Sequence, residues 1–159
     1  MSPPPVRARS LRPIVPPAVR PRVTVTSLDT ATGLPLTRTL DQASEVAFEH
    51  CRPIRRIPHY IGQHHTPGWF WSATTRTLLG YESYLESQWL TLYDFDQDVI
   101  GISTQSLILD GLGVGEVWAH TPDIFCRRAD GTAMLVDVKN PRLLDHPDVL
   151  VQTRRTLEA

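Results

Sequence analysis

The chain has few cysteines and no long apolar segment, and both absences limit the class of protein that it can be. Only two cysteines occur among the 159 residues, Cys51 and Cys126, so a disulfide scaffold is not expected and a reducing cytosol fits. No window approaches about 18 uninterrupted apolar residues, and the N-terminus lacks the apolar core of a signal peptide. We therefore expect a cytoplasmic protein without a membrane-spanning helix. With 41% hydrophobic and 21% charged residues, the composition predicts a soluble, folded domain.

Lysine is almost absent, and charge is unevenly distributed along the chain. Fifteen of the sixteen basic residues are arginine, and the single lysine is Lys139. The net charge is only -1, yet residues 1–80 carry ten arginines against four acids, whereas residues 81–159 carry six basic residues against thirteen acids. This asymmetry predicts a part that binds a polyanion beside a part that gathers carboxylates.

The sequence divides into three regions of different composition. Residues 1–22 hold seven of the fourteen prolines, five arginines and no acid, which predicts an extended or disordered basic arm that is either a solvated tail or a phosphate contact. Residues 23–76 form an extension for which we predict a β-hairpin over 23–40, a short helix over 41–50 started by Asp41, and a basic, aromatic loop with a short strand at 69–72.

In the third region, residues 77–159, the sequence pattern predicts a helix, three strands and a second helix, in that order. Apolar side chains at helical spacing predict a first helix over 78–93 with one buried stripe, formed by Leu78, Tyr81, Leu85, Trp89 and Leu92. The three predicted strands cover 99–109, 116–128 and 132–139, with a tight hairpin turn at 129–131, and the last helix covers 145–158 with Pro147 in its first turn.

The chemistry-bearing residues lie on the second and third predicted strands. A tight hairpin joins these strands, so Asp123 and Asp137 can stand near each other, and Asp137 and Lys139 share one side of the third strand. Two carboxylates with a backbone carbonyl can bind Mg²⁺, and a neighbouring lysine can orient a water and stabilise developing negative charge. This set is typical of phosphodiester hydrolysis. The alternative is a wet surface ion pair at a strand end.

Two glutamates on the preceding helix, Glu82 and Glu86, lie four residues apart and therefore share a face. Both directly follow positions predicted to be buried, so one of them could reach the metal site. The alternative for Glu86 is a capping-box residue, because Ser83 stands three residues before it. For Glu82 we favour a solvated helix face.

Five short motifs occur in a fixed order along the chain. They are YESYLE at 81–86, LTLYDFDQDV at 90–99, STQ at 103–105, HTPD at 120–123 and VDVK at 136–139. Taken together, they resemble the N-terminal nuclease domain of TnsA-type transposon endonucleases, members of the PD-(D/E)xK superfamily. The resemblance implies an α/β, restriction-endonuclease-like core over residues 77–159, with a mixed central sheet flanked by helices. The fourth strand of that core has no counterpart before the sequence ends, so we expect a core that is incomplete at its C-terminus.

The resemblance also implies an activity, a cofactor and partners. The activity is cleavage of double-stranded DNA at transposon ends, in a bacterial cytoplasm, with a TnsB-like DDE transposase and a TnsC-like AAA+ regulator. By position in the motifs, Glu86, Asp123 and Asp137 would bind Mg²⁺ or Mn²⁺, and Lys139 would be the catalytic lysine. Gln105 matches a family glutamine to which we assign no chemical role. Two other functions stay open: a non-catalytic assembly subunit that binds DNA or the transposase, and a stand-alone repair or defence nuclease.

A DNA-facing surface is predicted from basic residues that alternate with aromatic ones. The candidate DNA contacts are Arg52, Arg55, Arg56, Arg76 and His120. We interpret three other patterns as structural features rather than as binding or catalytic sites. The His and Cys residues at 50, 51, 59, 64 and 65 lack paired zinc-ligand spacing, the acidic run at 94, 96 and 98 is a solvated loop rather than a calcium site, and Cys126 belongs to the core.

Overall fold

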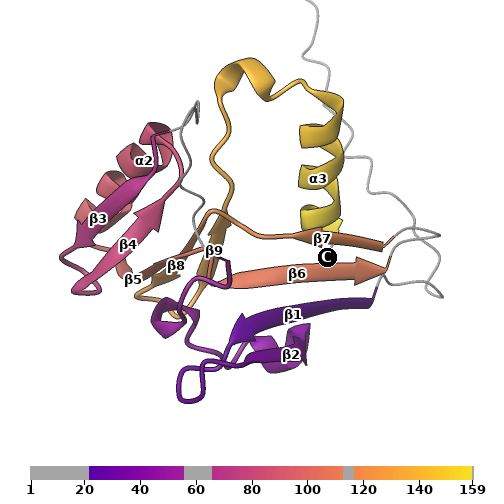
Figure 1. Ribbon diagram of the computed structural model, residues 1–159, viewed down its shortest axis with the longest axis horizontal. Helices are drawn as coiled ribbons and strands as arrows, with labels where there is room; N and C mark the ends of the chain where they lie inside the picture. The colour runs from indigo at the N-terminus through magenta and orange to yellow at the C-terminus, as the bar shows by residue number, and fades with distance from the viewer. Residues whose placement is uncertain (1–21, 56–65, 113–116, 159) are drawn as a thin grey trace, which may run out of the picture.

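A computed structural model describes residues 22–55, 66–112 and 117–158, and it combines α-helices with β-strands, as the sequence predicts (Figure 1). The predicted arm at 1–22 therefore lies outside the described residues except for its last residue. Residues 56–65 of the basic loop also lie outside them. The strands form three sheets, and every strand pair in the described part is antiparallel. The mixed central sheet that the resemblance implied is not seen there. None of the helices in the described ranges has the length and apolar character needed to cross a membrane.

The largest sheet has four strands in the order β2-β1-β6-β7. Its elements are β1 (Arg22–Leu28), β2 (Pro35–Thr39), β6 (Leu107–Leu112) and β7 (Val117–His120). The β1–β2 pair confirms the predicted hairpin, whose turn contains Gly33 at a φ of 71°. The helix predicted over 41–50 is shorter than expected. It spans only α1 (Leu40–Ala43), and a capping box starts it at Thr39 rather than at Asp41. A 3₁₀ turn, η1 (Phe48–His50), forms further along the predicted segment.

The other two sheets are smaller. A three-stranded sheet contains β5 (Val99–Thr104), β8 (Ile124–Arg128) and β9 (Ala133–Val136), in the order β5-β8-β9. The turn predicted at 129–131 joins β8 to β9, with Gly131 at a φ of 85° that favours glycine. A two-stranded hairpin pairs β3 (Gly68–Ser72) with β4 (Thr77–Tyr81). The strand predicted at 69–72 is therefore confirmed.

Two predicted strands are each broken into two, and this correction positions the site. The predicted strand at 99–109 divides into β5 and β6 at Gln105, whose φ of 49° is left-handed, and the one at 116–128 divides into β7 and β8 at residues 121–123. The two breaks lie opposite each other, because the Gln105 N–H donates to the Asp123 carbonyl oxygen at 3.1 Å. The four strands therefore act as one long hairpin with a kink in the middle. Such irregularities re-aim side chains and recur beside active sites.

The first predicted helix begins later than expected and buries a different face. Residues 77–81 form strand β4, and α2 (Tyr84–Phe95) starts after the N-cap Ser83. Its buried positions are Glu86 and Leu90, whereas Leu92, predicted to be buried, is 60% exposed. The reason is a tertiary contact. The Asp94 carboxylate accepts hydrogen bonds from the Ser72 hydroxyl at 2.6 Å and from the backbone N–H groups of residues 73 and 74, which fixes the rotation of the helix against the β3–β4 hairpin.

The last helix, α3 (Pro147–Glu158), confirms the prediction over 145–158. A 3₁₀ turn, η2 (Pro141–Leu143), precedes it, and the Asn140 side chain caps this turn. Strand β9 ends at Val136, so Asp137 and Lys139 lie just beyond the strand rather than within it. In Figure 1, α2 lies against the β3–β4 hairpin at one end of the molecule and α3 stands beside β7, with the kinked strands between them.

Two apolar clusters surround the kink. One joins β1, β6, β7 and η1, and the other joins α2, β4, β5 and β8 around fully buried Leu90, Ile102 and Cys126. Cys126 is therefore a core residue, as the sequence predicts.

The Cys126 thiol is expected to resist alkylation while the protein is folded. Burial raises the pKa of Cys126 to about 12, so almost no reactive thiolate exists at pH 8. Treatment with iodoacetamide at pH 8, followed by mass spectrometry, should leave Cys126 unmodified in the native protein and modify it fully in urea. Rapid modification of the native protein would contradict the position of this side chain in the core.

Candidate active site

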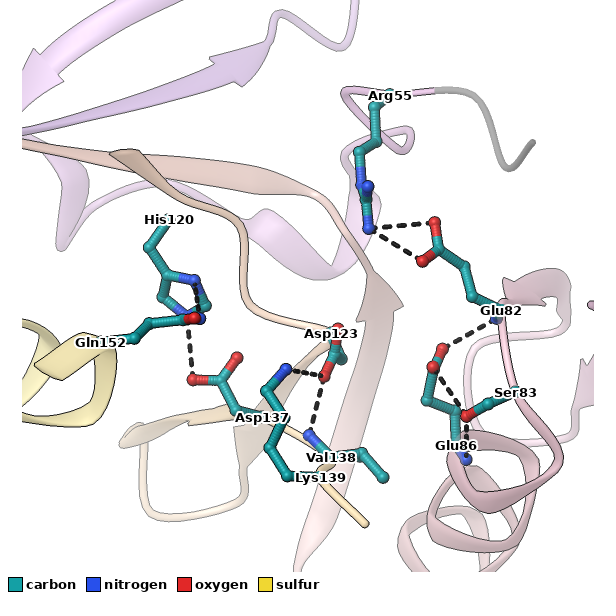
Figure 2. A network of polar contacts seen from close by, with 10 residues as sticks. All are labelled: Arg55, Glu82, Ser83, Glu86, His120, Asp123, Asp137, Val138, Lys139 and Gln152. Atoms are coloured by element: carbon teal, nitrogen blue, oxygen red, sulfur yellow. Dashed lines mark hydrogen bonds and ion pairs between the residues drawn. The ribbon is translucent and has the colours of Figure 1, made fainter. Parts of the chain in front are cut away.

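Asp123 lies at the kink, immediately before β8, and its carboxylate is held from two sides (Figure 2). One carboxylate oxygen, Oδ2, accepts a hydrogen bond from the Val138 N–H at 2.7 Å, and the Lys139 ammonium lies 3.5 Å from the same oxygen. The residue is only 9% exposed. Burial raises the pKa of the Asp123 carboxyl, and the Lys139 ammonium and the Val138 N–H oppose that rise. The geometry thus joins two of the predicted catalytic residues.

Asp137 takes part in a different set of contacts. Its Oδ2 lies 2.8 Å from Nε2 of His120, at the end of β7, and Nδ1 of that histidine lies 2.6 Å from the side-chain nitrogen of Gln152 on α3. The other carboxylate oxygen of Asp137, Oδ1, is buried without a hydrogen-bond partner. His120, predicted to contact DNA, is 6% exposed and serves here as a buried link between two side chains.

Glu86 contacts Ser83, as the capping-box alternative predicts, but its side chain reaches the Glu82 N–H rather than the N-cap N–H of Ser83. Its two carboxylate oxygens accept hydrogen bonds from the Glu82 N–H and from the Ser83 hydroxyl, each at 2.8 Å, at the first turn of α2. The residue is 8% exposed. Burial raises the pKa of Glu86, the two hydrogen bonds oppose the rise, and the nearby Asp123 charge adds to it. Glu86 therefore helps to fix the start of α2, and its carboxylate also feels the negative charge of Asp123.

A cavity of about 510 Å³ brings these elements together. Glu86, Asp123, Lys139 and His120 line it, whereas Asp137 is not among its lining residues. The cavity therefore contains three of the four predicted catalytic residues. Other lining residues come from the segment before β3, the residue after β4, strand β7 and the residue after it, and helix α3. They include Arg55, Glu82, Trp118, Thr121, Asp148, Val151, Gln152 and Arg155.

The predicted DNA contacts are spread over different places. Arg55 lines the cavity and forms an ion pair with Glu82 at 3.0 Å. Arg52 and Arg76 are exposed and do not line the cavity, and Arg56 lies outside the described residues. The solvated position that we favoured for Glu82 is thus replaced by an ion pair at the cavity wall.

The sequence did not identify the contributions of α3. Asp148, Gln152 and Arg155 reach the cavity from a helix that the sequence placed correctly, but no motif marks these residues as functional. The only available signal was their spacing of three to four residues, which puts them on one face of a helix. That spacing is common on solvated helices, so it does not by itself indicate a site.

The donor chemistry of the site suits a hard divalent cation. Carboxylate oxygens are the ligands that Mg²⁺ prefers, and the unpartnered, buried Oδ1 of Asp137 is an oxygen that such an ion could satisfy. Within residues 22–55, 66–112 and 117–158, however, no group of three or more His, Cys, Asp or Glu side chains is assembled around one point. Glu86, Asp123 and Asp137 therefore have suitable oxygens without forming one ready-made ligand set. Three of the histidines in the less favoured zinc cluster, His59, His64 and His65, lie outside the described residues.

Gln105 is the least satisfied polar residue beside the kink. It is 2% exposed, both polar atoms of its side chain are buried without a hydrogen-bond partner, and its backbone is left-handed. Unpaired buried amides and strained backbones each cost about 1–3 kcal/mol. Both costs fall on the residue that pairs with Asp123 across the kink, where strain is typical of functional sites.

Comparisons with known proteins do not assign a family to this chain. No family model, no curated protein and no solved structure matches it.

Proposed function

We propose that this chain is a metal-dependent endonuclease subunit that hydrolyses a phosphodiester bond of double-stranded DNA. One observation carries the proposal: the carboxylate of Asp123 and the ammonium of Lys139 meet 3.5 Å apart at the wall of a cavity that Glu86 also lines. These residues come from three segments of the chain. The helix glutamate comes first along the sequence, the Pro-Asp pair second and the Asp-x-Lys unit third. The restriction-endonuclease-like fold and the PD-(D/E)xK family are part of this proposal.

The proposed mechanism gives a role to each of the four predicted catalytic residues, three of which line the cavity. Asp123, Asp137 and Glu86 would supply oxygen ligands to Mg²⁺ or Mn²⁺. Such an ion, when bound, neutralises charge on the phosphate and lowers the pKa of a water. Lys139 lies 3.5 Å from Asp123, so its ammonium would be able to orient the attacking water and to stabilise negative charge that develops on the phosphate. Its compact point charge suits this task better than a guanidinium group.

The DNA backbone would contact the arginines that line the cavity. Arg55 and Arg155 line the cavity, and a phosphate has the charge that both residues bind. Contacts from Arg52, Arg56 and Arg76 would extend the footprint along the duplex. Cleavage at transposon ends, with TnsB-like and TnsC-like partners in a bacterial cytoplasm, is the setting that we propose by resemblance.

One observation favours a second candidate, a non-catalytic subunit that binds DNA or the transposase. Hydrogen bonds within the protein already occupy both oxygens of Glu86 and one oxygen of Asp137. A subunit that only needs these residues to hold its fold would show the same contacts. The two candidates differ in whether the cavity supports hydrolysis.

The test is cleavage of a supercoiled plasmid, and of a duplex bearing defined transposon ends, with Mg²⁺, with Mn²⁺ and with a chelator. Lys139→Ala is expected to reduce metal-dependent cleavage by about 100-fold or more, the loss typical of removing one charge-stabilising donor. Arg142→Ala is the matched control, because it removes one positive charge from an exposed position that does not line the cavity. Unchanged cleavage by Lys139→Ala would refute the catalytic assignment. A wild-type protein that binds DNA without cutting it would support the second candidate.

A further inference from the structure

Asp137 presents an imbalance that calls for an explanation. One of its carboxylate oxygens is firmly bound to His120, while the other is buried with no partner. A buried carboxylate oxygen without a hydrogen bond is costly, because it has lost water and gained nothing in return. The unpartnered oxygen of Asp137 is explained if a bound ligand contacts it.

The two shortest contacts of His120 fit one tautomer of the neutral imidazole. A carboxylate can only accept, so Nε2 of His120 must donate to Oδ2 of Asp137. The amide nitrogen of Gln152 can only donate, so Nδ1 of His120 must accept from it at 2.6 Å. Both contacts are satisfied by one imidazole with a single proton on Nε2. The chain of donors runs in one direction, from α3 through β7 to the carboxylate.

Helix α3 has little apolar contact to hold it in place. Leu150 and Leu157 on this helix are 55% and 82% exposed. The amide of Gln152 is therefore a specific contact between a weakly packed helix and a buried histidine. Figure 2 shows how that contact leads from α3 to the Asp137 carboxylate beside Lys139.

We propose that His120 and Gln152 are positioning residues for Asp137. They fix its Oδ2 and thereby orient its Oδ1 as a ligand for the divalent cation. This inference depends on the proposed function, since it concerns the same metal. Hydrogen bonds that orient metal-binding side chains commonly change metal affinity or activity by 10–100-fold when they are removed. The inference makes α3, which carries no nuclease motif, part of the metal site.

The experiment measures Mn²⁺ binding to the full chain by calorimetry, without DNA, and the Mg²⁺ concentration that half-saturates cleavage. His120→Ala and Gln152→Ala are expected to weaken Mn²⁺ binding by about 10–100-fold and to raise the Mg²⁺ requirement to a similar degree. His120→Gln should recover most of the affinity, because its amide nitrogen can donate to Asp137 as Nε2 does. Thr153→Ala, at an exposed position of the same helix, should behave as wild type.

The outcomes separate this inference from the proposed function. If wild-type protein binds Mn²⁺ and cleaves DNA, but His120→Ala and Gln152→Ala bind Mn²⁺ as tightly, the positioning role is wrong and the nuclease stands. If the variants lose Mn²⁺ affinity while the wild type cleaves no DNA, the nuclease fails and the positioning role stands. If His120→Ala does not fold, the decisive variant is His120→Gln. If His120→Gln binds Mn²⁺ as weakly as Gln152→Ala does, a hydrogen bond donated to Asp137 is not what supports metal binding, and the inference is wrong. If the wild-type protein binds no Mn²⁺, the positioning role of His120 and Gln152 is also wrong.

Discussion

Replacing Asp123 with asparagine is expected to reduce metal-dependent DNA cleavage by about 1,000-fold or more while the protein stays folded. The loss follows from charge, because a neutral amide is a weak ligand for Mg²⁺ and a bound metal contributes several kcal/mol to stabilising the transition state. Folding is preserved because asparagine keeps an oxygen that can accept the Val138 N–H hydrogen bond. It also removes a buried charge.

The measurement compares single-turnover cleavage rates and DNA affinity in the same buffer. Asp123→Asn should bind duplex DNA at least as tightly as wild type, because it removes one negative charge from a surface that faces phosphate. Asp145→Asn is the matched control, since it changes the net charge equally at an exposed position away from the cavity. Circular dichroism verifies the fold. Retained cleavage by a folded Asp123→Asn would remove Asp123 from the mechanism and leave DNA binding as the function to test.

The parts of the fold that the sequence predicts well are set by local rules. The hairpin turns at Gly33 and Gly131 need a left-handed residue, and glycine supplies it at both. Helix α3 has a proline at its first position and an amphipathic pattern, both visible in the sequence. Such signals act over a few residues, so they hold whatever the rest of the chain does.

The kink could not be predicted because it depends on contacts between distant segments. The pattern of residues 99–109 predicts one continuous strand, and nothing in that pattern marks Gln105 as left-handed. The break becomes clear only when Gln105 faces Asp123 across the hairpin. A glutamine in this conformation goes against its own backbone preference, and tertiary structure overrides the preference.

The candidate site likewise contains residues that the sequence could identify and residues that it could not. The motifs identified Glu86, Asp123 and Lys139, because their types and order carry chemical information, and all three line one cavity. The link from Asp137 through His120 to Gln152 joins residues 17 and 32 positions apart. No local pattern encodes a contact of that kind. The sequence could therefore name candidate site residues without finding the residues that contact them.

The clearest test of the fold beneath the site is a pair of leucines on α2. Leu90→Ala is expected to lower the free energy of unfolding by about 3 kcal/mol, because Leu90 is fully buried and its removal leaves a cavity in the core. Leu92→Ala should change it by less than about 0.5 kcal/mol, because that side chain is 60% exposed. Urea unfolding followed by circular dichroism measures both, and the two variants delete the same atoms from the same helix.

The comparison also tests the orientation of Glu86. The face of α2 that buries Leu90 is the face that carries Glu86 one turn earlier, so the two residues must point inward together. The sequence pattern alone predicts the opposite result, with Leu92 in the buried stripe. If Leu92→Ala proved the more damaging change, α2 would be rotated and Glu86 would face away from Asp123. The proposed metal site would then lose its helix ligand, whatever the activity of Lys139.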